Sequence, residues 1–268
     1  MTLADEVVSS FDGAASPRLA ELMTGLVRHL HAFVAEVGLT EQEWTTAIDF
    51  LTRTGQKCDE KRQEFILLSD VLGASMAVIN ANHPTNGAAT ESTVLGPFFV
   101  PDAPEFGPDA DISAGAPGTP CHVRGTVRTP TGAPIPNADI DVWQSDETGH
   151  YDVQYADLDH PRARARLHTD AAGRFSFHTI HPEAYPIPTD GPVGELLNAA
   201  SRSPMRPAHI HFKITAPGYH PLTTHLFAAG DPHLSSDAVF GVKPSLIVNF
   251  SSHQATYDFT LAELPPTP

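Results

Sequence analysis

The chain has 268 residues, of which 41% are hydrophobic, so it can build a packed core and is not globally disordered. Its formal net charge of −16 argues against a nucleic-acid partner, because an acidic surface repels phosphate backbones. The 15 histidines and only two cysteines indicate that any metal site uses nitrogen and oxygen ligands.

Neither a secretion signal nor a membrane span is expected. The first residues, MTLADEVVSSFDGAASP, are acidic and lack an apolar stretch, and no segment approaches the roughly 18 apolar residues that a span requires. Cys58 and Cys121 lie far apart and do not suggest a disulfide framework. We therefore expect a cytoplasmic protein.

Helical patterns dominate the first third of the chain. Ser16 and Pro17 are typical of a helix start, apolar residues recur at helical spacing over 19–37, and Gly38 ends the run.

A second helix is predicted to begin at a capping box formed by Thr40 and Glu43 and to end at Gly55. A third helix is predicted over about 59–79, where the apolar surface is wider than one stripe. Residues 83–120 are rich in Pro, Gly, Ala and Asp and are predicted to form a long loop.

From Cys121 onward, apolar residues alternate with a period of two. Short strands are predicted at CHVRGTVRT, ADIDVWQ, RFSFHTI, AHIHFKIT, TTHLFA and SLIVNF, with a short helix over 192–203. Because no helical pattern separates most of these strands, an antiparallel β-sandwich is favoured over a parallel sheet. We expect an α+β chain with a helical region (1–105) followed by the sandwich domain (106–268).

Two histidines at alternate positions of one predicted strand form the sharpest local signal. The string RPAHIHF places His209 and His211 two residues apart, so both imidazoles lie on one face of the strand and could share a metal ion. The alternative is a polar, solvated sheet face, which this short pattern alone favours.

Two of the five tyrosines lie in turn-rich loops. Tyr151 occurs in Thr-Gly-His-Tyr-Asp and Tyr185 in Pro-Glu-Ala-Tyr-Pro. A phenol has a pKa of about 10, so a tyrosinate at neutral pH needs a strong Lewis acid, of which ferric iron is the usual one. The alternative is that both are ordinary loop tyrosines.

Three strings together resemble the intradiol ring-cleaving dioxygenases: RPAHIHF, the Gly149-His150-Tyr151 turn after a Val-Trp strand, and YPIPTDGP. The resemblance covers nearly the whole chain. It implies a non-haem Fe(III) cofactor held by Tyr151, Tyr185, His209 and His211.

Other motifs resemble one branch of this family. YDVQ, TTHLF and VFGVK are most similar to hydroxyquinol 1,2-dioxygenases, whereas catechol dioxygenases usually carry Thr-Thr-Gln in place of Thr-Thr-His. The implied reaction is intradiol cleavage of hydroxyquinol (1,2,4-trihydroxybenzene) with O₂ to 3-hydroxy-cis,cis-muconate, a tautomer of maleylacetate, in aromatic catabolism. Catechol and chlorocatechols remain open as substrates. A non-enzymatic, transthyretin-like β-sandwich binding module is an alternative of another class.

The resemblance also implies residue roles. Tyr185 would leave the metal when substrate binds and act as a base, and Arg206 would lie beside the substrate ring, unless it only forms a salt bridge. Asp70 would accept a hydrogen bond from the third ring hydroxyl, unless it lies on a solvated helix face. The implied substrate pocket comprises Leu67, Asp70, Val94, Leu95, Gly96, Pro97, Phe98, Ile187, Pro188, Arg206 and Val239.

Partners follow from the same resemblance. It implies a homodimer built through the N-terminal helices, with a phospholipid in the dimer groove as a further implied ligand. Leu95 stands where hydroxyquinol enzymes often carry an aromatic residue, a departure that would reshape the pocket.

Overall fold

The computed structural model describes residues 1–60, 62–83 and 88–265. It divides into two compact units, Met1–Arg53 and Thr54–Pro268. The helices that follow residue 53 therefore belong to the same unit as the strands. The functional division between residues 105 and 106 stays a prediction.

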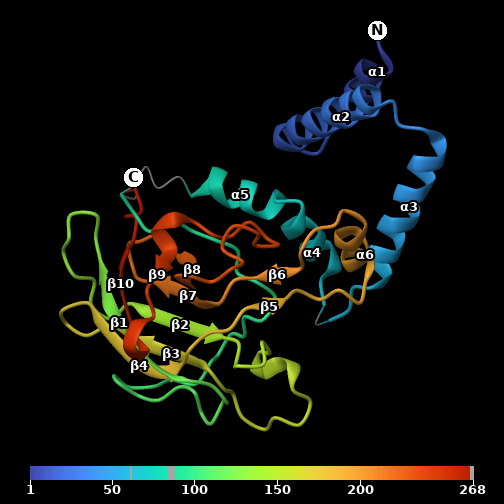
Figure 1. Ribbon diagram of the computed structural model, residues 1–268. Helices are drawn as coiled ribbons and strands as arrows, with labels where there is room; N and C mark the ends of the chain where they lie inside the picture. Colours follow the sequence, from blue (N-terminus) through green and yellow to red (C-terminus); the bar gives the residue numbers. More distant parts are fainter. Residues whose placement is uncertain (61, 84–87, 266–268) are drawn as a thin grey trace. The chain divides into compact units, whose positions relative to one another are not determined.

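Capping residues set the ends of the first helices, α1 (Leu3–Ser9), α2 (Pro17–Val37) and α3 (Glu41–Gln56) (Figure 1). Ser16 Oγ accepts a hydrogen bond from the Leu19 N–H, and Gly38, with φ of 60°, ends α2 as predicted. The predicted capping box of α3 is also confirmed, because Thr40 and Glu43 each donate a backbone N–H to the other's side chain. Helix α1 was not predicted.

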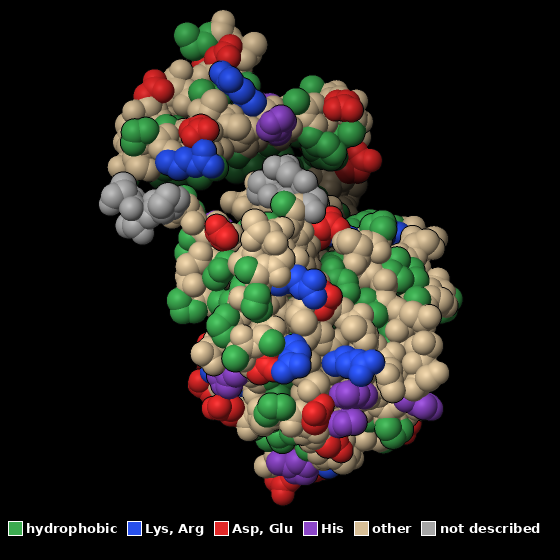
Figure 2. Space-filling view, turned by 90° about the vertical axis from the view of Figure 1, so that its left-hand side faces the viewer, with side chains coloured by type: hydrophobic (Ala, Val, Ile, Leu, Met, Phe, Trp, Pro, Cys, Tyr) green, Lys and Arg blue, Asp and Glu red, His purple; other side chains and the backbone are tan. Residues whose placement is uncertain are grey.

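Helix α2 keeps most of its apolar side chains on the surface. Val27 is its one buried residue, whereas Leu22, Leu26 and Leu30 are each more than half exposed. Figure 2 shows hydrophobic side chains beside charged ones on the molecular surface. Within its own unit, Met1–Arg53, the apolar stripe of α2 is therefore left uncovered.

The predicted helix over 59–79 is wrong, because the structure has two helices there. Helices α4 (Glu64–Val71) and α5 (Ala74–Asn82) are separated at Gly73, whose φ of 72° lies in the left-handed region. The two helix axes meet at 77°. Among the described residues no single helix is long and apolar enough to cross a bilayer, although this bent pair meets the length and composition criteria together.

A buried carboxylate joins α4 to α6 (Pro192–Ala199), the short helix predicted over 192–203 (Figure 1). Glu64 is fully buried and accepts a hydrogen bond at 3.1 Å from the N–H of Val193, in the first turn of α6. Arg62 lies 2.8 Å from the same carboxylate. A buried carboxylate is stable only when it is paired. Because one partner of Glu64 lies in the first turn of α6, this pairing holds α4 against α6.

The strands form two main sheets and one short ribbon. The three-stranded sheet has the order β10-β1-β4, the five-stranded sheet β3-β2-β7-β8-β9, and the ribbon β5-β6. Most pairs are antiparallel, but β1 with β10 and β8 with β9 are parallel. The strand bounds are β1 (Pro120–Arg128), β2 (Asp139–Gln144), β3 (Arg164–His168), β4 (Arg174–Ile180), β5 (Tyr185–Pro186), β6 (Met205–Arg206), β7 (His209–Thr215), β8 (Leu222–Ala228), β9 (Ile247–Val248) and β10 (Gln254–Thr260).

The hydrophobic core lies between the two main sheets. Phe212 of β7 contacts Phe177 of β4 and Phe259 of β10, with ring centroids 6.3 and 4.9 Å apart. Each fully buried aromatic ring contributes roughly 1.5–3 kcal/mol. Since Ile210 and Phe212 face this core, the alternation of β7 places His209 and His211 on its opposite face.

Candidate metal centre

Four side-chain atoms on the outer side of the five-stranded sheet form a closed ring. Tyr151 Oη lies 3.1 Å from Tyr185 Oη and 2.9 Å from His211 Nε2. His209 Nε2 lies 3.4 Å from Tyr185 Oη and 3.1 Å from His211 Nε2. Ligands about 2.0–2.1 Å from one ion are about 2.9 Å apart at right angles and about 3.3 Å apart in a tetrahedron. The ring, called the tetrad below, therefore has the spacing of a metal site.

Strand β7 supplies both imidazoles, and neither is solvated. His209 and His211 are 0% and 1% exposed, so the alternative of a polar surface face is wrong. His209 Nδ1 lies 2.6 Å from the carbonyl oxygen of Pro207 and donates to it, which leaves the lone pair of Nε2 in the tetrad. Trp143 of β2 stacks on the His211 ring at 4.7 Å and restrains its orientation.

Tyr151 is positioned by the turn that follows β2. It precedes a 3₁₀ helix, η1 (Asp152–Gln154), and its N–H donates to Gln154 Oε1 at 2.8 Å. The next residue, Asp152, accepts a hydrogen bond at 2.9 Å from Nε of Arg164 on β3. Phe98 stacks on the phenol ring with centroids 4.4 Å apart.

The ribbon β5-β6 supplies the second tyrosine. Tyr185 pairs directly with Arg206 across this ribbon. Arg206 Nη1 lies 3.2 Å from His209 Nε2, and its Nε donates to Asp237 Oδ1 at 3.2 Å. Arg206 therefore forms a salt bridge, as one alternative predicted, and also lies at the tetrad, whereas its place beside a substrate ring stays a prediction.

The Arg206 guanidinium is almost fully buried, and its Nη2 has no hydrogen-bond partner among the described residues. Burial alone would lower the pKa of Arg206, but the charges of Asp237, Tyr185 and Tyr151 raise it by more. The net pKa is therefore raised, and the guanidinium stays cationic. A fixed cation with an unused donor next to the tetrad is suited to stabilise negative charge there.

Burial also sets the protonation of the tetrad. It raises the pKa of Tyr151, with Tyr185 adding to the effect and Arg206 opposing it. It lowers the pKa values of His209 and His211, and Arg206 lowers both further. The imidazoles are therefore neutral donors, and a bound cation is needed to hold a tyrosinate. Two phenol oxygens, two imidazole nitrogens and no thiolate fit a hard cation such as Fe(III).

A third histidine extends the site beyond the predicted ligands. His225 on β8 is the cross-strand partner of His211 on β7, and their Nε2 and Nδ1 atoms lie 2.8 Å apart. His225 Nδ1 lies 2.6 Å from Thr93 Oγ1. Burial and the neighbouring His211 lower the pKa of His225, so it too is neutral.

A cavity of about 460 Å³ adjoins the tetrad. Gly96 lines it, and a Cβ on this residue would lie only 3.1 Å from Cε1 of His211. Eight of the predicted pocket residues line the cavity: Leu67, Asp70, Val94, Leu95, Gly96, Pro97, Phe98 and Pro188. Ile187, Arg206 and Val239 are buried but do not line it. Seven residues line it without having been predicted: Arg62, Gln63, Glu64, Ile66, Ser75, Ile79 and Gln154.

Asp70 is the one carboxylate among the predicted lining residues. It is only 6% exposed, so the alternative of a solvated helix face is wrong. Burial raises its pKa, while a hydrogen bond with Ser75 and the charge of Arg206 lower it. Glu64 also lines the cavity but is paired with Arg62 and with the N–H of Val193. Asp70 is thus the lining carboxylate that can accept a hydrogen bond from a bound molecule.

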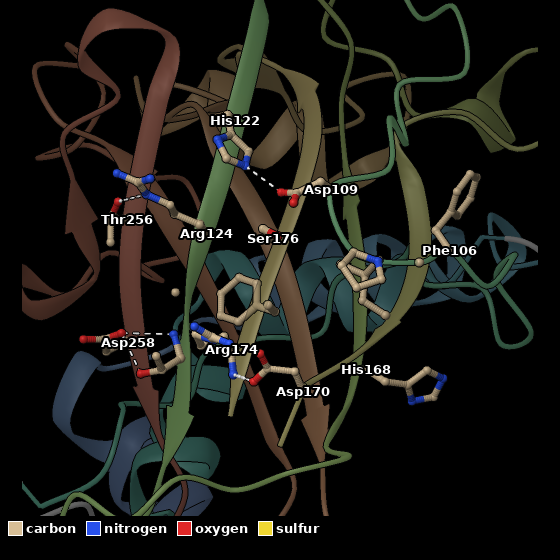
Figure 3. A pocket seen from close by; sticks show the side chains of 16 residues that line it. Phe106, Asp109, His122, Arg124, His168, Asp170, Arg174, Ser176, Thr256 and Asp258 are labelled. Atoms are coloured by element: carbon tan, nitrogen blue, oxygen red, sulfur yellow. Dashed lines mark hydrogen bonds and ion pairs between the residues drawn. The ribbon is translucent and has the colours of Figure 1, made fainter. Parts of the chain in front are cut away.

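A larger cavity, of about 570 Å³, lies at the three-stranded sheet, but its polar groups already pair with one another (Figure 3). His122 lies 3.3 Å from Asp109, and Arg174 lies 2.8 Å from Asp170. Asp109, His122 and His178 could be read as a second metal cluster. The two imidazoles stack at 12°, however, so their in-plane lone pairs do not converge on one ion.

Comparison with known proteins agrees with this geometry. The family model of the catechol dioxygenase N terminus matches residues 16–90, and that of the dioxygenase domain matches residues 94–263. The chain is 57% identical to a hydroxyquinol 1,2-dioxygenase from Rhodococcus opacus over 249 residues, covering 92% of this chain and 83% of the relative. It is 53% identical to the hydroxyquinol 1,2-dioxygenase of Nocardioides simplex, covering 94% and 86%.

A solved structure gives the same result for the fold. The crystal structure of hydroxyquinol 1,2-dioxygenase from Pseudomonas putida DLL-E4 superposes with a TM-score of 0.93 at 47% identity, covering 98% of both chains. The two family models together span most of the sequence. The chain therefore belongs to the intradiol ring-cleavage dioxygenases.

Proposed function

We propose that this enzyme cleaves hydroxyquinol between its two adjacent hydroxyl-bearing carbons. The observation that carries the proposal is the buried carboxylate of Asp70 in the cavity beside the tetrad. With its two adjacent hydroxyls at the metal, a catechol ring would have no further donor for this carboxylate, whereas hydroxyquinol would offer its third hydroxyl. The names of the two relatives described above, both hydroxyquinol 1,2-dioxygenases, support the same substrate.

The proposed cofactor is Fe(III), held by Tyr151, Tyr185, His209 and His211. When bound, it would lower the pKa values of the substrate hydroxyls and draw electron density from the ring as a Lewis acid. The spacing of the tetrad and its hard oxygen and nitrogen donors support this choice.

The residues of the chain would prepare the substrate for O₂. Tyr185 Oη would accept the proton of one substrate hydroxyl as a general base. Arg206 would stabilise the negative charge that develops on the ring, through the Nη2 atom that has no partner among the described residues. Pro188 and the 94–98 segment would enclose the ring and exclude water. Incorporation of both atoms of O₂ gives 3-hydroxy-cis,cis-muconate.

The test is oxygen uptake by the iron-loaded enzyme with hydroxyquinol, catechol and chlorocatechols. We expect hydroxyquinol to give the highest kcat/KM. Asp70→Ala should lower that value by about 10- to 100-fold, the range for a lost hydrogen bond to a charged group, and should change catechol turnover much less. Ser75→Ala is the matched control, because it removes another polar group that lines the cavity but keeps the carboxylate.

Two outcomes would contradict the assignment. Equal losses on both substrates in Asp70→Ala would mean that Asp70 does not read the third hydroxyl, and a wild-type preference for catechol or a chlorocatechol would change the substrate. A protein that binds no stoichiometric iron and consumes no oxygen would instead favour the transthyretin-like binding module.

We further propose a homodimer formed through the N-terminal helices, with a phospholipid as an additional ligand in the groove between them. The exposed apolar face of α2, which includes Leu22, Leu26 and Leu30, supports this assembly. Light scattering after size exclusion would measure the mass, and mass spectrometry of an organic extract would detect the lipid.

The two free cysteines, Cys58 and Cys121, support a location in the reducing cytoplasm.

A further inference from the structure

A chain of hydrogen bonds between three buried side chains ends at one imidazole of the tetrad. It runs from Thr93 Oγ1 to His225 Nδ1 over 2.6 Å, and from His225 Nε2 to His211 Nδ1 over 2.8 Å. All three side chains are at most 2% exposed. The N–H of Thr93 also donates to the carbonyl oxygen of Thr223 at 2.8 Å, which holds the end of the chain in place.

This chain can carry its protons in two complete arrangements, because a neutral imidazole has one N–H and one lone pair and a hydroxyl can donate or accept. In the first, His211 Nδ1–H donates to His225, and His225 Nδ1–H donates to Thr93. His211 Nε2 then offers its lone pair to a metal. In the second, Thr93 donates to His225 and His225 donates to His211, so the proton on His211 lies on Nε2 and blocks it.

The other imidazole of the tetrad has no such freedom. His209 Nδ1 faces the carbonyl oxygen of Pro207 at 2.6 Å, and a carbonyl can only accept. The proton of His209 therefore stays on Nδ1, and the lone pair of its Nε2 always faces the tetrad and Arg206. The two histidines, only two residues apart on one strand, differ in what fixes their tautomers: a backbone carbonyl for His209 and a side-chain relay for His211.

We propose that His225 and Thr93 are positioning residues that select the metal-binding tautomer of His211, with Thr93 Oγ1 as the terminal acceptor. The inference rests on the proposed iron site and adds to it two residues that are not ligands. Groups that orient a metal-bound histidine in this way typically change metal affinity by about 10- to 100-fold when they are removed.

Matched pairs of variants test the relay. His225→Leu has no acceptor for His211 Nδ1–H, whereas His225→Gln offers an amide oxygen. Thr93→Val removes the terminal acceptor, which leaves a buried His225 N–H without a partner in the first arrangement, whereas Thr93→Ser retains the hydroxyl. The affinity for Fe(III) is measured by competition with nitrilotriacetate, following the tyrosinate-to-iron absorption band.

We expect His225→Leu and Thr93→Val to bind Fe(III) about 10- to 100-fold more weakly, and His225→Gln and Thr93→Ser to stay within about threefold of wild type. In metal-free protein labelled with ¹⁵N-histidine, Thr93→Val should shift the His211 ring toward the Nε2–H tautomer and leave His209 unchanged. A purely structural role would not move this tautomer ratio.

Equal Fe(III) affinity in wild type, His225→Leu and Thr93→Val would overturn the relay while leaving the iron site intact. An unchanged His211 tautomer in Thr93→Val would overturn it as well. A wild-type protein that binds no Fe(III) would instead overturn the proposed function on which the relay rests.

Discussion

The ion pair between Arg206 and Asp237 is the contact on which the charge next to the tetrad depends most directly. Both side chains are at most 4% exposed, and Arg206 Nε lies 3.2 Å from Asp237 Oδ1. At this distance and an effective dielectric constant of about 20, the attraction is about 5 kcal/mol. The N–H groups of Val239 and Gly241 also donate to the carboxylate of Asp237.

Asp237→Asn should therefore be severe although it preserves size. An asparagine has one amide oxygen, so its NH₂ group must face either Arg206 Nε or the N–H of Gly241. We expect the free energy of unfolding at pH 7 to fall by about 3–5 kcal/mol, the range for breaking a buried pair. With Arg206 displaced, kcat should fall while KM changes less, because the lost interaction acts on developing charge.

Urea unfolding followed by circular dichroism measures the first effect, and oxygen uptake measures the second. Asp258→Asn is the matched control, because Asp258 pairs with Arg128 at 2.7 Å with both side chains well exposed, and such pairs contribute at most about 1 kcal/mol. The reasoning is refuted if Asp237→Asn loses no more stability than this control and keeps its kcat.

Four further results are expected. Tyr185→Phe should shift the tyrosinate-to-iron band and lower kcat by at least about 100-fold in oxygen uptake; unchanged kinetics would remove Tyr185 from its role. Removing iron with a chelator should bleach that band and abolish turnover, and re-adding iron should restore both. Gly96→Ala should cost about 1–2 kcal/mol in urea unfolding, because φ is 77°, and should weaken Fe(III) binding, because its Cβ would press on His211. Burial raises the pKa of folded Asp70, so its ionisation lowers stability as the pH rises from the unfolded value, about 3.9, through the folded one. Asp70→Asn should therefore be more stable than wild type at pH 7 and lose this advantage in acid unfolding curves below about pH 4.

Local signals in the sequence predict the helix ends and the core of the site. Ser16 and Gly38 bound α2 as expected, because capping involves neighbours within one turn. The alternation of β7 predicts that His209 and His211 share a face, and the structure brings both tyrosines to that face.

The groups that support the site could not be predicted in the same way. Asp237 is 31 residues from Arg206, and Thr93 is 132 residues from His225. Such partners are set by tertiary packing rather than by spacing. Strands β3 and β10 were both missed. The apolar residues of β3 alternate with arginines, of which Arg164 pairs with Asp152 and Arg166 with Asp141, and this composition weakens the strand signal.

The break at Gly73 has a consequence for how the cavity reads its substrate. In a continuous helix, residues 70 and 75 would point about 140° apart, so Asp70 and Ser75 could not both line one cavity. The left-handed residue between them turns the second helix so that both side chains enter one cavity. The break at which the helical period fails thus brings two polar side chains from one stretch of chain into the same cavity. A residue with a side chain at position 73 would strain this left-handed break, on which the shared orientation of Asp70 and Ser75 depends.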